Sequence, residues 1–204
     1  MKKYLIGILL IIILAACAIL FWKQVSVIVK NNIVFLHRDN EVLSLYTINP
    51  DGSDRKLIYR HSDPVNANII NPKWSTDSTI IFAAMKDKEW KIFSIDKDGS
   101  NLKLTNLNDP NFLVSQESRD KNIIVEGLGG QKEYTIYRLD NGEKIKVYTT
   151  ECASVCSAGG PIHEVSFSPD KKHIIFDKEK DIMIIDADGK KPHILTEGES
   201  ADWR

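Results

Sequence analysis

Residues 163–189 read HEVSFSPDKKHIIFDKEKDIMIIDADG, and residues 71–99 read NPKWSTDSTIIFAAMKDKEWKIFSIDKDG. The two stretches share a Ser-x-Asp turn, an apolar run ending in Ile-Ile-Phe, a second apolar run and a closing Asp-x-Asp-Gly. Such self-similarity is the signature of a repeat architecture. The chain therefore repeats one structural unit, and the rest of the sequence can be searched for further copies.

Four copies are present. One apolar segment recurs ahead of an Asn or Asp turn, as LYTI at 45–48, IFSI at 92–95, IYRL at 136–139 and IMII at 182–185. The intervals between copies are roughly 44–47 residues, in the range of propeller repeats. One column of the alignment holds Tyr46, Phe93, Tyr137 and Met183.

Each copy predicts four short strands separated by turns. The second strand of a copy is IIF at 80–82, IIV at 123–125 or IIF at 174–176, and the hairpin turns contain Asp-Gly or Asn-Gly, which favour tight hairpins. Apolar residues occupy both faces of IFSI and IMII, so both faces of each sheet should be covered. Four-stranded antiparallel units with this period indicate an all-β fold, a four-bladed β-propeller.

The two ends of the repeat region complement each other. NNIVFLH at 31–37 begins at a second strand, and the final SADWR resembles a first strand, with Trp203 in the column of Trp74 and Phe167. We expect Trp203 to pair beside Ile33, Val34 and Phe35, which would close the ring and remove exposed strand edges. We favour a monomer closed on itself; in the alternative, a partial ring dimerises and two chains form a larger ring.

The repeat resembles the TolB-type β-propeller repeat, whose signature is approximately Trp-Ser-Pro-Asp-Gly, an apolar strand and Asp-x-Asp-Gly before Leu-Thr. The resemblance covers about residues 31–204, taken as one domain, and is strongest in the second and fourth copies. It depends on Trp74, Ser75, Asp77, Ser168, Pro169, Asp170, Asp98–Gly99, Asp188–Gly189, Leu104–Thr105 and Leu195–Thr196. TolB has an extra domain before a longer propeller, so its role in envelope transport is not implied.

Residues 1–30 form a separate hydrophobic segment and short linker. Residues 4–22 carry no charge, follow Lys2 and Lys3, and are long enough as a helix to cross a roughly 30 Å hydrocarbon core. The preceding basic residues favour an inside N-terminus, which places the domain on the extracytoplasmic side, periplasmic or at the cell surface. LAAC, ending at Cys17, resembles a bacterial lipoprotein signal; we favour an uncleaved anchor because the apolar run continues beyond Cys17, and both readings tether the domain.

The charge composition argues against a nucleic-acid-binding function, and two nearby cysteines suggest a disulfide. The chain has 204 residues with 27 Lys and Arg against 28 Asp and Glu, so it lacks the basic surface that nucleic acid requires. Cys152 and Cys156 lie in an insertion between the third and fourth copies, and two thiols in an exported protein usually pair. We expect a disulfide; redox thiols or a metal site including His163 are the alternatives.

The recurring polar residues are expected to build turns. Asp77, Asp98, Gly99, Asp170, Asp188 and Gly189 recur at repeat positions, whereas a catalytic group is needed only once, and the Asp-rich turns lack the remaining ligands of a calcium loop. We therefore predict no catalytic residue, metal or cofactor. The favoured function is a non-catalytic module that binds a protein in the cell envelope; a small-molecule or glycan receptor using the central channel is the alternative, and a propeller lyase or hydrolase a less favoured one.

Overall fold

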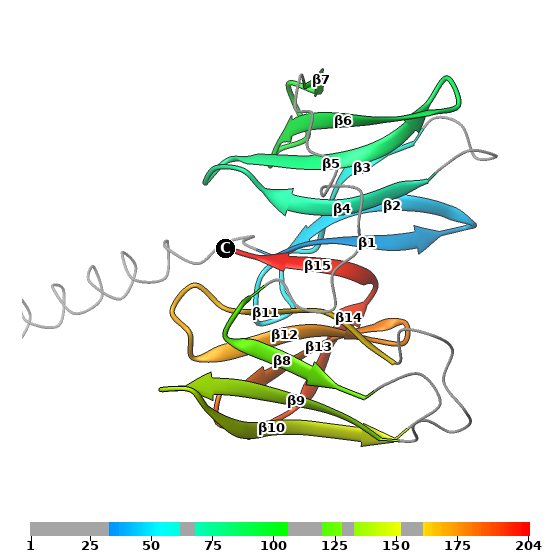
Figure 1. Ribbon diagram of the computed structural model, residues 1–204. Helices are drawn as coiled ribbons and strands as arrows, with labels where there is room; N and C mark the ends of the chain where they lie inside the picture. Colours follow the sequence, from blue (N-terminus) through cyan, green and yellow to red (C-terminus); the bar gives the residue numbers. More distant parts are fainter. Residues whose placement is uncertain (1–32, 62–67, 106–119, 128–132, 152–160) are drawn as a thin grey trace, which may run out of the picture.

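A computed structural model describes residues 33–61, 68–105, 120–127, 133–151 and 161–204. Its regular elements are β-strands, β1 to β15, which pair into four antiparallel sheets (Figure 1). We number the sheets 1 to 4 in the order in which their copies occur along the chain. This arrangement is a propeller-like all-β fold, as the four sequence copies predicted.

Sheets 1, 2 and 4 have four strands, and the described part of sheet 3 has three. Sheet 1 contains β15 (Glu199–Trp203), β1 (Ile33–Asp39), β2 (Val42–Ile48) and β3 (Lys56–Arg60). Sheet 2 contains β4 (Ile69–Trp74), β5 (Thr79–Lys86), β6 (Glu89–Asp96) and β7 (Lys103–Leu104). Sheet 3 contains β8 (Ile123–Glu126), β9 (Glu133–Asp140) and β10 (Glu143–Glu151). Sheet 4 contains β11 (Ile162–Phe167), β12 (His173–Lys178), β13 (Asp181–Asp186) and β14 (His193–Glu197).

Sheet 1 is assembled from both ends of the described chain. β15 runs antiparallel to β1, with Trp203 opposite Ile33 and Asp202 opposite Val34, and the register shifts at Phe35. β1 therefore has a partner on each side, because β2 pairs with its other edge. The fourth strand of this sheet comes from the last copy in the sequence.

The innermost strand of each four-stranded sheet contains a bulge at the same repeat position. The residue at this bulge has a positive φ in all three strands: 51° at Asn71, 52° at Glu164 and 56° at Ser200. A bulge bends its strand and increases the local twist. The recurrence shows that β15 is the structural equivalent of β4 and β11.

Each sheet has two distinct faces. We call the face that carries the Tyr46, Phe93, Tyr137 and Met183 column the front face, and the opposite one the back face. The core clusters pack a back face on a front face three times: sheet 1 on sheet 2, sheet 4 on sheet 1, and sheet 3 on sheet 4. The fully buried aromatic side chains at these three contacts are Phe82, Phe35, and Phe176 with Tyr134.

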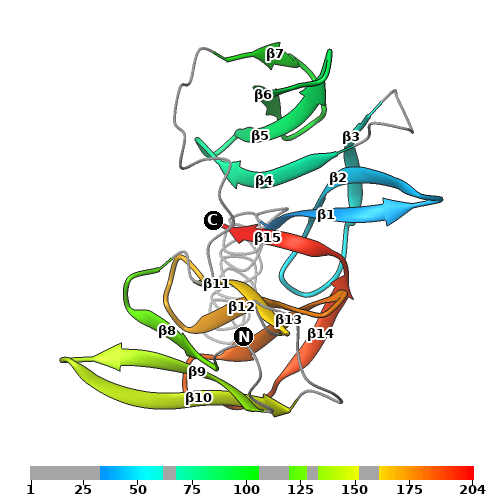
Figure 2. The same cartoon turned by 45° about the vertical axis from the view of Figure 1, so that its right-hand side comes forward.

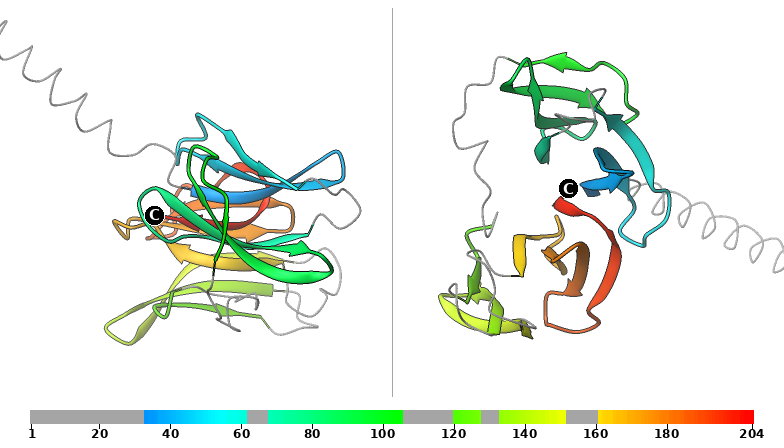
Figure 3. Two further views of the ribbon diagram at one scale, coloured as in Figure 1. Left: turned by 90° about the horizontal axis from the view of Figure 1, so that it is seen from above. Right: turned by 90° about the vertical axis from the view of Figure 1, so that its right-hand side faces the viewer.

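The four sheets follow an open arc in the order 2, 1, 4, 3 (Figures 2 and 3). None of the core clusters formed by the described residues joins sheet 2 to sheet 3. Within the described part of the chain, the ring expected from the complementary ends is therefore not closed between these two sheets. The shared sheet 1 joins the two ends of the chain, but it lies in the middle of the arc and fixes no contact between sheets 2 and 3.

Sheet 3 also differs from the alignment of the copies. Ile124 lies opposite Tyr137 in sheet 3, as Phe82 lies opposite Phe93 in sheet 2, so NII at 122–124 is the counterpart of IIF and the expected IIV at 123–125 is one residue out of register. A one-residue shift moves every side chain to the other face, which places Ile123 on the back face with Tyr134 and Ile136. The expected first strand of this copy, before Ser118, lies outside the described residues.

Candidate functional site

β15, the strand that completes sheet 1, is joined to both neighbouring sheets by carboxylate hydrogen bonds. We call it the closing strand. Asp202 Oδ2 accepts a hydrogen bond of 2.8 Å from the backbone N–H of Trp74 in sheet 2. Asp177 of sheet 4 is only 4% exposed, and its carboxylate accepts the backbone N–H groups of Ser200 and Ala201. Hydrogen bonds to a buried charged group stabilise more than neutral ones, so these two side chains fix β15 between its neighbouring sheets.

Trp203 and Arg204 extend the closing strand to the surface. The Trp203 ring stacks on the imidazole of His173, with centroids 5.9 Å apart. His173 Nε2 lies 3.4 Å from Asp186 Oδ1, and Arg204 Nη2 lies 2.8 Å from Asp77 Oδ1. The predicted turn residue Asp77 is thus brought to the end of β15, although its side chain is 94% exposed and the pair contributes little stability.

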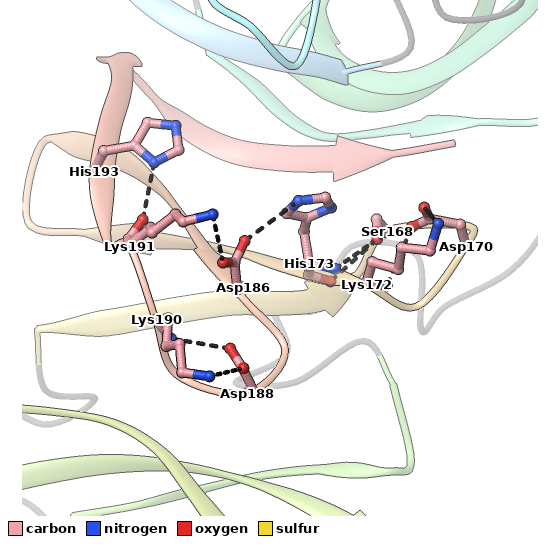
Figure 4. Close-up of polar contacts among 9 residues, drawn as sticks. All are labelled: Ser168, Asp170, Lys172, His173, Asp186, Asp188, Lys190, Lys191 and His193. Atoms are coloured by element: carbon pink, nitrogen blue, oxygen red, sulfur yellow. Dashed lines mark hydrogen bonds and ion pairs between the residues drawn. The ribbon is translucent and has the colours of Figure 1, made fainter.

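Figure 4 shows the Ser-x-Asp turn of sheet 4 beside this strand. Ser168 Oγ donates to Asp170 Oδ1 at 2.7 Å and accepts the His173 N–H at 3.0 Å. The Lys172 N–H donates to the same Asp170 oxygen at 3.1 Å. These donors, the Ser168 hydroxyl above all, lower the pKa of Asp170, so its carboxylate acts as a local cap of the turn.

In the Asp-Gly turns, too, a carboxylate accepts hydrogen bonds from its own turn. Asp98 Oδ1 accepts both the N–H and the hydroxyl of Ser100, at 2.9 and 2.6 Å, and these bonds lower the Asp98 pKa. Asp188 accepts Lys190 Nζ at 2.7 Å, which lowers the Asp188 pKa (Figure 4). Each carboxylate bonds within its own turn, which is the role expected of a recurring turn residue.

The glycines of these turns touch a neighbouring sheet. Gly99 has φ +89°, and a Cβ there would lie 3.0 Å from the carbonyl oxygen of Ile58 in sheet 1. Gly189 has φ +82°, and its Cβ would lie 2.5 Å from the carbonyl oxygen of Val147 in sheet 3. Both positions require glycine for backbone conformation and for space.

A small recess lies on the seam between sheets 1 and 4. It has a volume of about 240 Å³, and it lies between β1, the β12–β13 turn and the β14–β15 connection. The connection approaches β1 closely, since Gly198 has no side chain. A Cβ built on Gly198 would lie 2.7 Å from the Leu36 carbonyl oxygen. The lining residues are Leu36, His37, Arg38, Lys180, Glu197, Gly198 and Glu199.

Charges of both signs surround this recess. His37 Nδ1 lies 3.1 Å from the Glu197 carbonyl oxygen and His37 Nε2 3.3 Å from Asp39 Oδ1. Lys180 Nζ lies 3.5 Å from Glu197 Oε1, and Arg38 Nη1 donates to a backbone carbonyl at 3.0 Å. Cationic and anionic side chains around one recess suit a ligand that carries charged groups of both signs.

Asp39 anchors one wall of the recess. It accepts the Tyr46 hydroxyl and lies 3.0 Å from Arg60 Nη2, which joins β1 to β2 and β3. The Tyr46 hydrogen bond is the main cause of a lowered Asp39 pKa, and burial is the main cause of a raised Tyr46 pKa. The Arg55 guanidinium covers the Tyr46 ring at 4.6 Å from its centroid.

Several predicted residues lie outside the described part of the chain. These are the span 4–22 and Cys17, which would tether the domain, and the expected Cys152–Cys156 disulfide. Among the described residues, no helix is long and apolar enough to cross a membrane. The same residues contain no cluster of three side chains suited to hold a metal ion, and His163 lies in β11.

Asp177, Asp202 and Gly198 were not identified from the sequence. Asp202 shares its repeat column with Lys73 and Ser166, so the comparison of copies does not single it out. Gly198 lies between Glu197 and Glu199, in a connection whose length varies among the copies. Their roles depend on contacts between sheets, which no local pattern reports.

Comparison with known proteins finds remote structural likeness to propeller proteins and no matching family. No family model and no curated protein matches the chain. Among solved structures, TolB from Acinetobacter baumannii is 17% identical, with a TM-score of 0.32 over 81% of this chain and 41% of that chain. A putative TolB from Agrobacterium tumefaciens is 14% identical, with a TM-score of 0.25 over 82% of this chain and 63% of that chain. An oligogalacturonate lyase from Vibrio parahaemolyticus is 14% identical, with a TM-score of 0.27 over 76% of this chain and 43% of that chain. The chain thus spans about two fifths to three fifths of these structures, and the likeness concerns the propeller-like fold alone.

Proposed function

We propose that this chain is a non-catalytic interaction module, tethered to the outer side of a membrane, that binds a segment of a partner protein at the recess between sheets 1 and 4. The observation that carries the proposal is the composition of the recess, where cationic and anionic side chains from β1, the β12–β13 turn and the β14–β15 connection lie together. Polypeptides supply acidic and basic groups side by side, which this arrangement complements.

The size of the recess favours a polypeptide over an enclosed small ligand. Pockets for drug-sized ligands occupy roughly 300–1,000 Å³ and bury most of the ligand. A volume of about 240 Å³ accommodates one or two side chains of a longer segment that continues over the surface. Arg38 and Lys180 would bind its acidic groups, and Glu199 its basic ones.

The tether is the second part of the proposal. An uncharged span at 4–22 preceded by lysines supports an anchor, and Cys17 as a lipidation site is the alternative. Either would hold the domain within reach of envelope proteins and would raise its effective concentration toward them.

Photo-crosslinking in native membranes tests the binding surface. A photoreactive residue is placed in the full chain at Lys180 in the recess, or at Lys190 on a turn of the same sheet; the two side chains are 77% and 74% exposed. We expect a discrete adduct with one partner at Lys180 and none at Lys190. Equal adducts at both positions, or none at Lys180, would contradict the proposal.

Charge reversal at the recess provides the matched control. Arg38→Glu should reduce the Lys180 adduct at least about tenfold, because an unfavourable charge pair in a contact costs on the order of 1–2 kcal/mol or more. Lys172→Glu, on the turn shown in Figure 4, should leave the adduct unchanged. A thermal shift produced by a sugar instead of a peptide, and lost in Arg38→Glu, would identify the glycan-receptor alternative.

A further inference from the structure

Among the described residues, two faces at the ends of the arc have no partner sheet. The back face of sheet 2 carries a small apolar cluster of Ile70, Ile81, Ala83 and Ile92. Trp90 lies on this face beside Met85 and is 36% exposed. The front face of sheet 3 carries Ile124 opposite Tyr137, and both side chains are half-buried.

These two faces are of opposite type. At all three contacts within the arc, a back face packs on a front face. The unpaired back face of sheet 2 and the unpaired front face of sheet 3 are therefore the combination that the fold uses at every other contact. Two unpaired back faces, or two unpaired front faces, would not match the packing seen within the chain.

The hairpin glycines give an independent indication. Gly52 of sheet 1 approaches Leu195 of sheet 4, Gly99 of sheet 2 approaches Ile58 of sheet 1, and Gly189 of sheet 4 approaches Val147 of sheet 3. Gly142 is the equivalent residue of sheet 3 and has φ +85°, but no atom of the described residues lies within 4 Å of a Cβ built there. The turn has the conformation of its counterparts but lacks the neighbouring outer strand that they contact.

The missing strand corresponds to β7 of sheet 2. Leu57, Leu104 and Ile194 occupy one column, each opposite a residue of the aromatic-and-Met column. The backbone that Gly142 would meet is therefore the one just after Leu104, a residue that is 58% exposed. Sheet 2 and sheet 3 lie at opposite ends of the arc formed by the described residues, so a β7 at this position would come from another molecule (Figure 3).

We propose that the end faces of two copies of this chain pair with each other, the back face of sheet 2 of one on the front face of sheet 3 of its partner, to form a closed ring of eight sheets. Rotation about the ring axis relates the copies, so the same contact forms twice and no end face remains, as closed oligomers require. Both copies of β1 begin on the same side of this ring, so two tethers could enter one membrane. The contact uses other surfaces than the recess, and the two proposals can fail separately.

The protein mass of the full chain in detergent, measured by light scattering with correction for detergent, tests the pairing. We expect two copies per particle for the unmodified chain and one copy for Ile81→Glu and for Tyr137→Glu, because either charge disrupts both contacts of the ring. Ile194→Glu, at a side chain 58% exposed on the outer strand of sheet 4, should leave two copies. A single copy for the unmodified chain across micromolar concentrations would overturn the proposal.

Mixing distinguishes this pairing from contacts between like faces. Ser94→Arg adds bulk on the back face of sheet 2, opposite Ile81, without removing a core side chain, and serves if Ile81→Glu does not fold. An equimolar mixture of Ser94→Arg and Tyr137→Glu retains one undamaged contact, so we expect particles that contain one copy of each. Two copies retained by Tyr137→Glu alone would show that like faces pair, and would overturn the proposal.

Discussion

Among the described residues, sheets 1 and 4 pack against a neighbouring sheet on both faces, whereas sheets 2 and 3 do so on one face. The same kind of sequence builds both pairs, with apolar residues on both faces of the strands. In the middle of the arc this pattern gives side chains that are fully buried, such as Phe35 and Ile175. At the ends it leaves Ile81 and Tyr137 half-buried. Position in the arc, and not the local sequence, thus decides how much each repeated residue stabilises the fold.

Removing an aromatic side chain from each region should show the largest difference. We expect Phe35→Ala to lower the free energy of unfolding by about 3–5 kcal/mol, because it leaves a cavity where two sheets meet. Tyr137→Ala should cost roughly 1 kcal/mol in dilute protein, because its side chain is only half-buried and none of the described sheets packs on its face. Urea unfolding curves of both variants measure these values. Equal losses would show that the end face is as well packed as the middle of the arc.

The sheets themselves could be foreseen from the sequence, but the difference between the middle and the ends of the arc could not. The columns of the four copies predicted the sheets, and the strand missing at one end and present at the other predicted that β15 joins β1. The open arc could not be predicted, because the rotation between neighbouring sheets is not encoded in the period of the repeat. The register of sheet 3 was also misjudged, since Ile123, Ile124 and Val125 are all apolar and only the pairing of Ile124 with Tyr137 distinguishes the alternatives.

The seam residues were harder to find for a different reason. Repeat analysis recognises residues that recur, and it recognised the turn residues Asp98, Asp170 and Asp188. Asp177 and Asp202 each act once, by accepting backbone N–H groups of another sheet. Such a residue does not recur in the other copies. A contact that is unique to one junction between sheets can therefore be found only in the three-dimensional structure.

The hairpin glycines should give the next largest contrast. In Gly189→Ala the new methyl group lies 2.5 Å from the Val147 carbonyl oxygen, and we expect a loss of about 2–4 kcal/mol from crowding together with backbone strain. In Gly142→Ala the new methyl group meets no atom of the described residues within 4 Å, so the substitution should cost only the strain, roughly 1 kcal/mol.

The concentration dependence of these unfolding energies sharpens the contrast. If Gly142 meets the partner's β7, its cost rises with protein concentration as the copies associate, while the cost of Gly189→Ala stays nearly constant. A Gly142→Ala cost as large as that of Gly189→Ala in dilute protein would contradict the open end at sheet 3.

The smallest expected effect concerns acid. Asp39 joins three strands of sheet 1, and its pKa is lowered chiefly by the Tyr46 hydroxyl, whereas Asp98 in sheet 2 bonds only to Ser100 within its own turn. A carboxyl group whose pKa is lower in the folded state stabilises the fold above its unfolded pKa of about 3.9, and this contribution disappears as the pH falls through the folded pKa. We therefore expect Asp39→Asn to lower the free energy of unfolding at pH 7 by up to about 1 kcal/mol and to lose less stability than the unmodified protein between pH 5 and pH 2.

Asp98→Asn is the matched control for this measurement, because the carboxyl group is again replaced by an amide of the same shape. Its pH profile should follow the unmodified protein more closely than that of Asp39→Asn, since Asp98 holds together one exposed turn and not the strands of a sheet. Urea unfolding at several pH values gives both profiles. If Asp98→Asn reduced the loss of stability between pH 5 and pH 2 as much as Asp39→Asn does, a turn at the end of the arc would contribute as strongly to acid stability as the junction of β1, β2 and β3. Position in the arc would then govern the burial of apolar side chains but not the electrostatic contributions to stability.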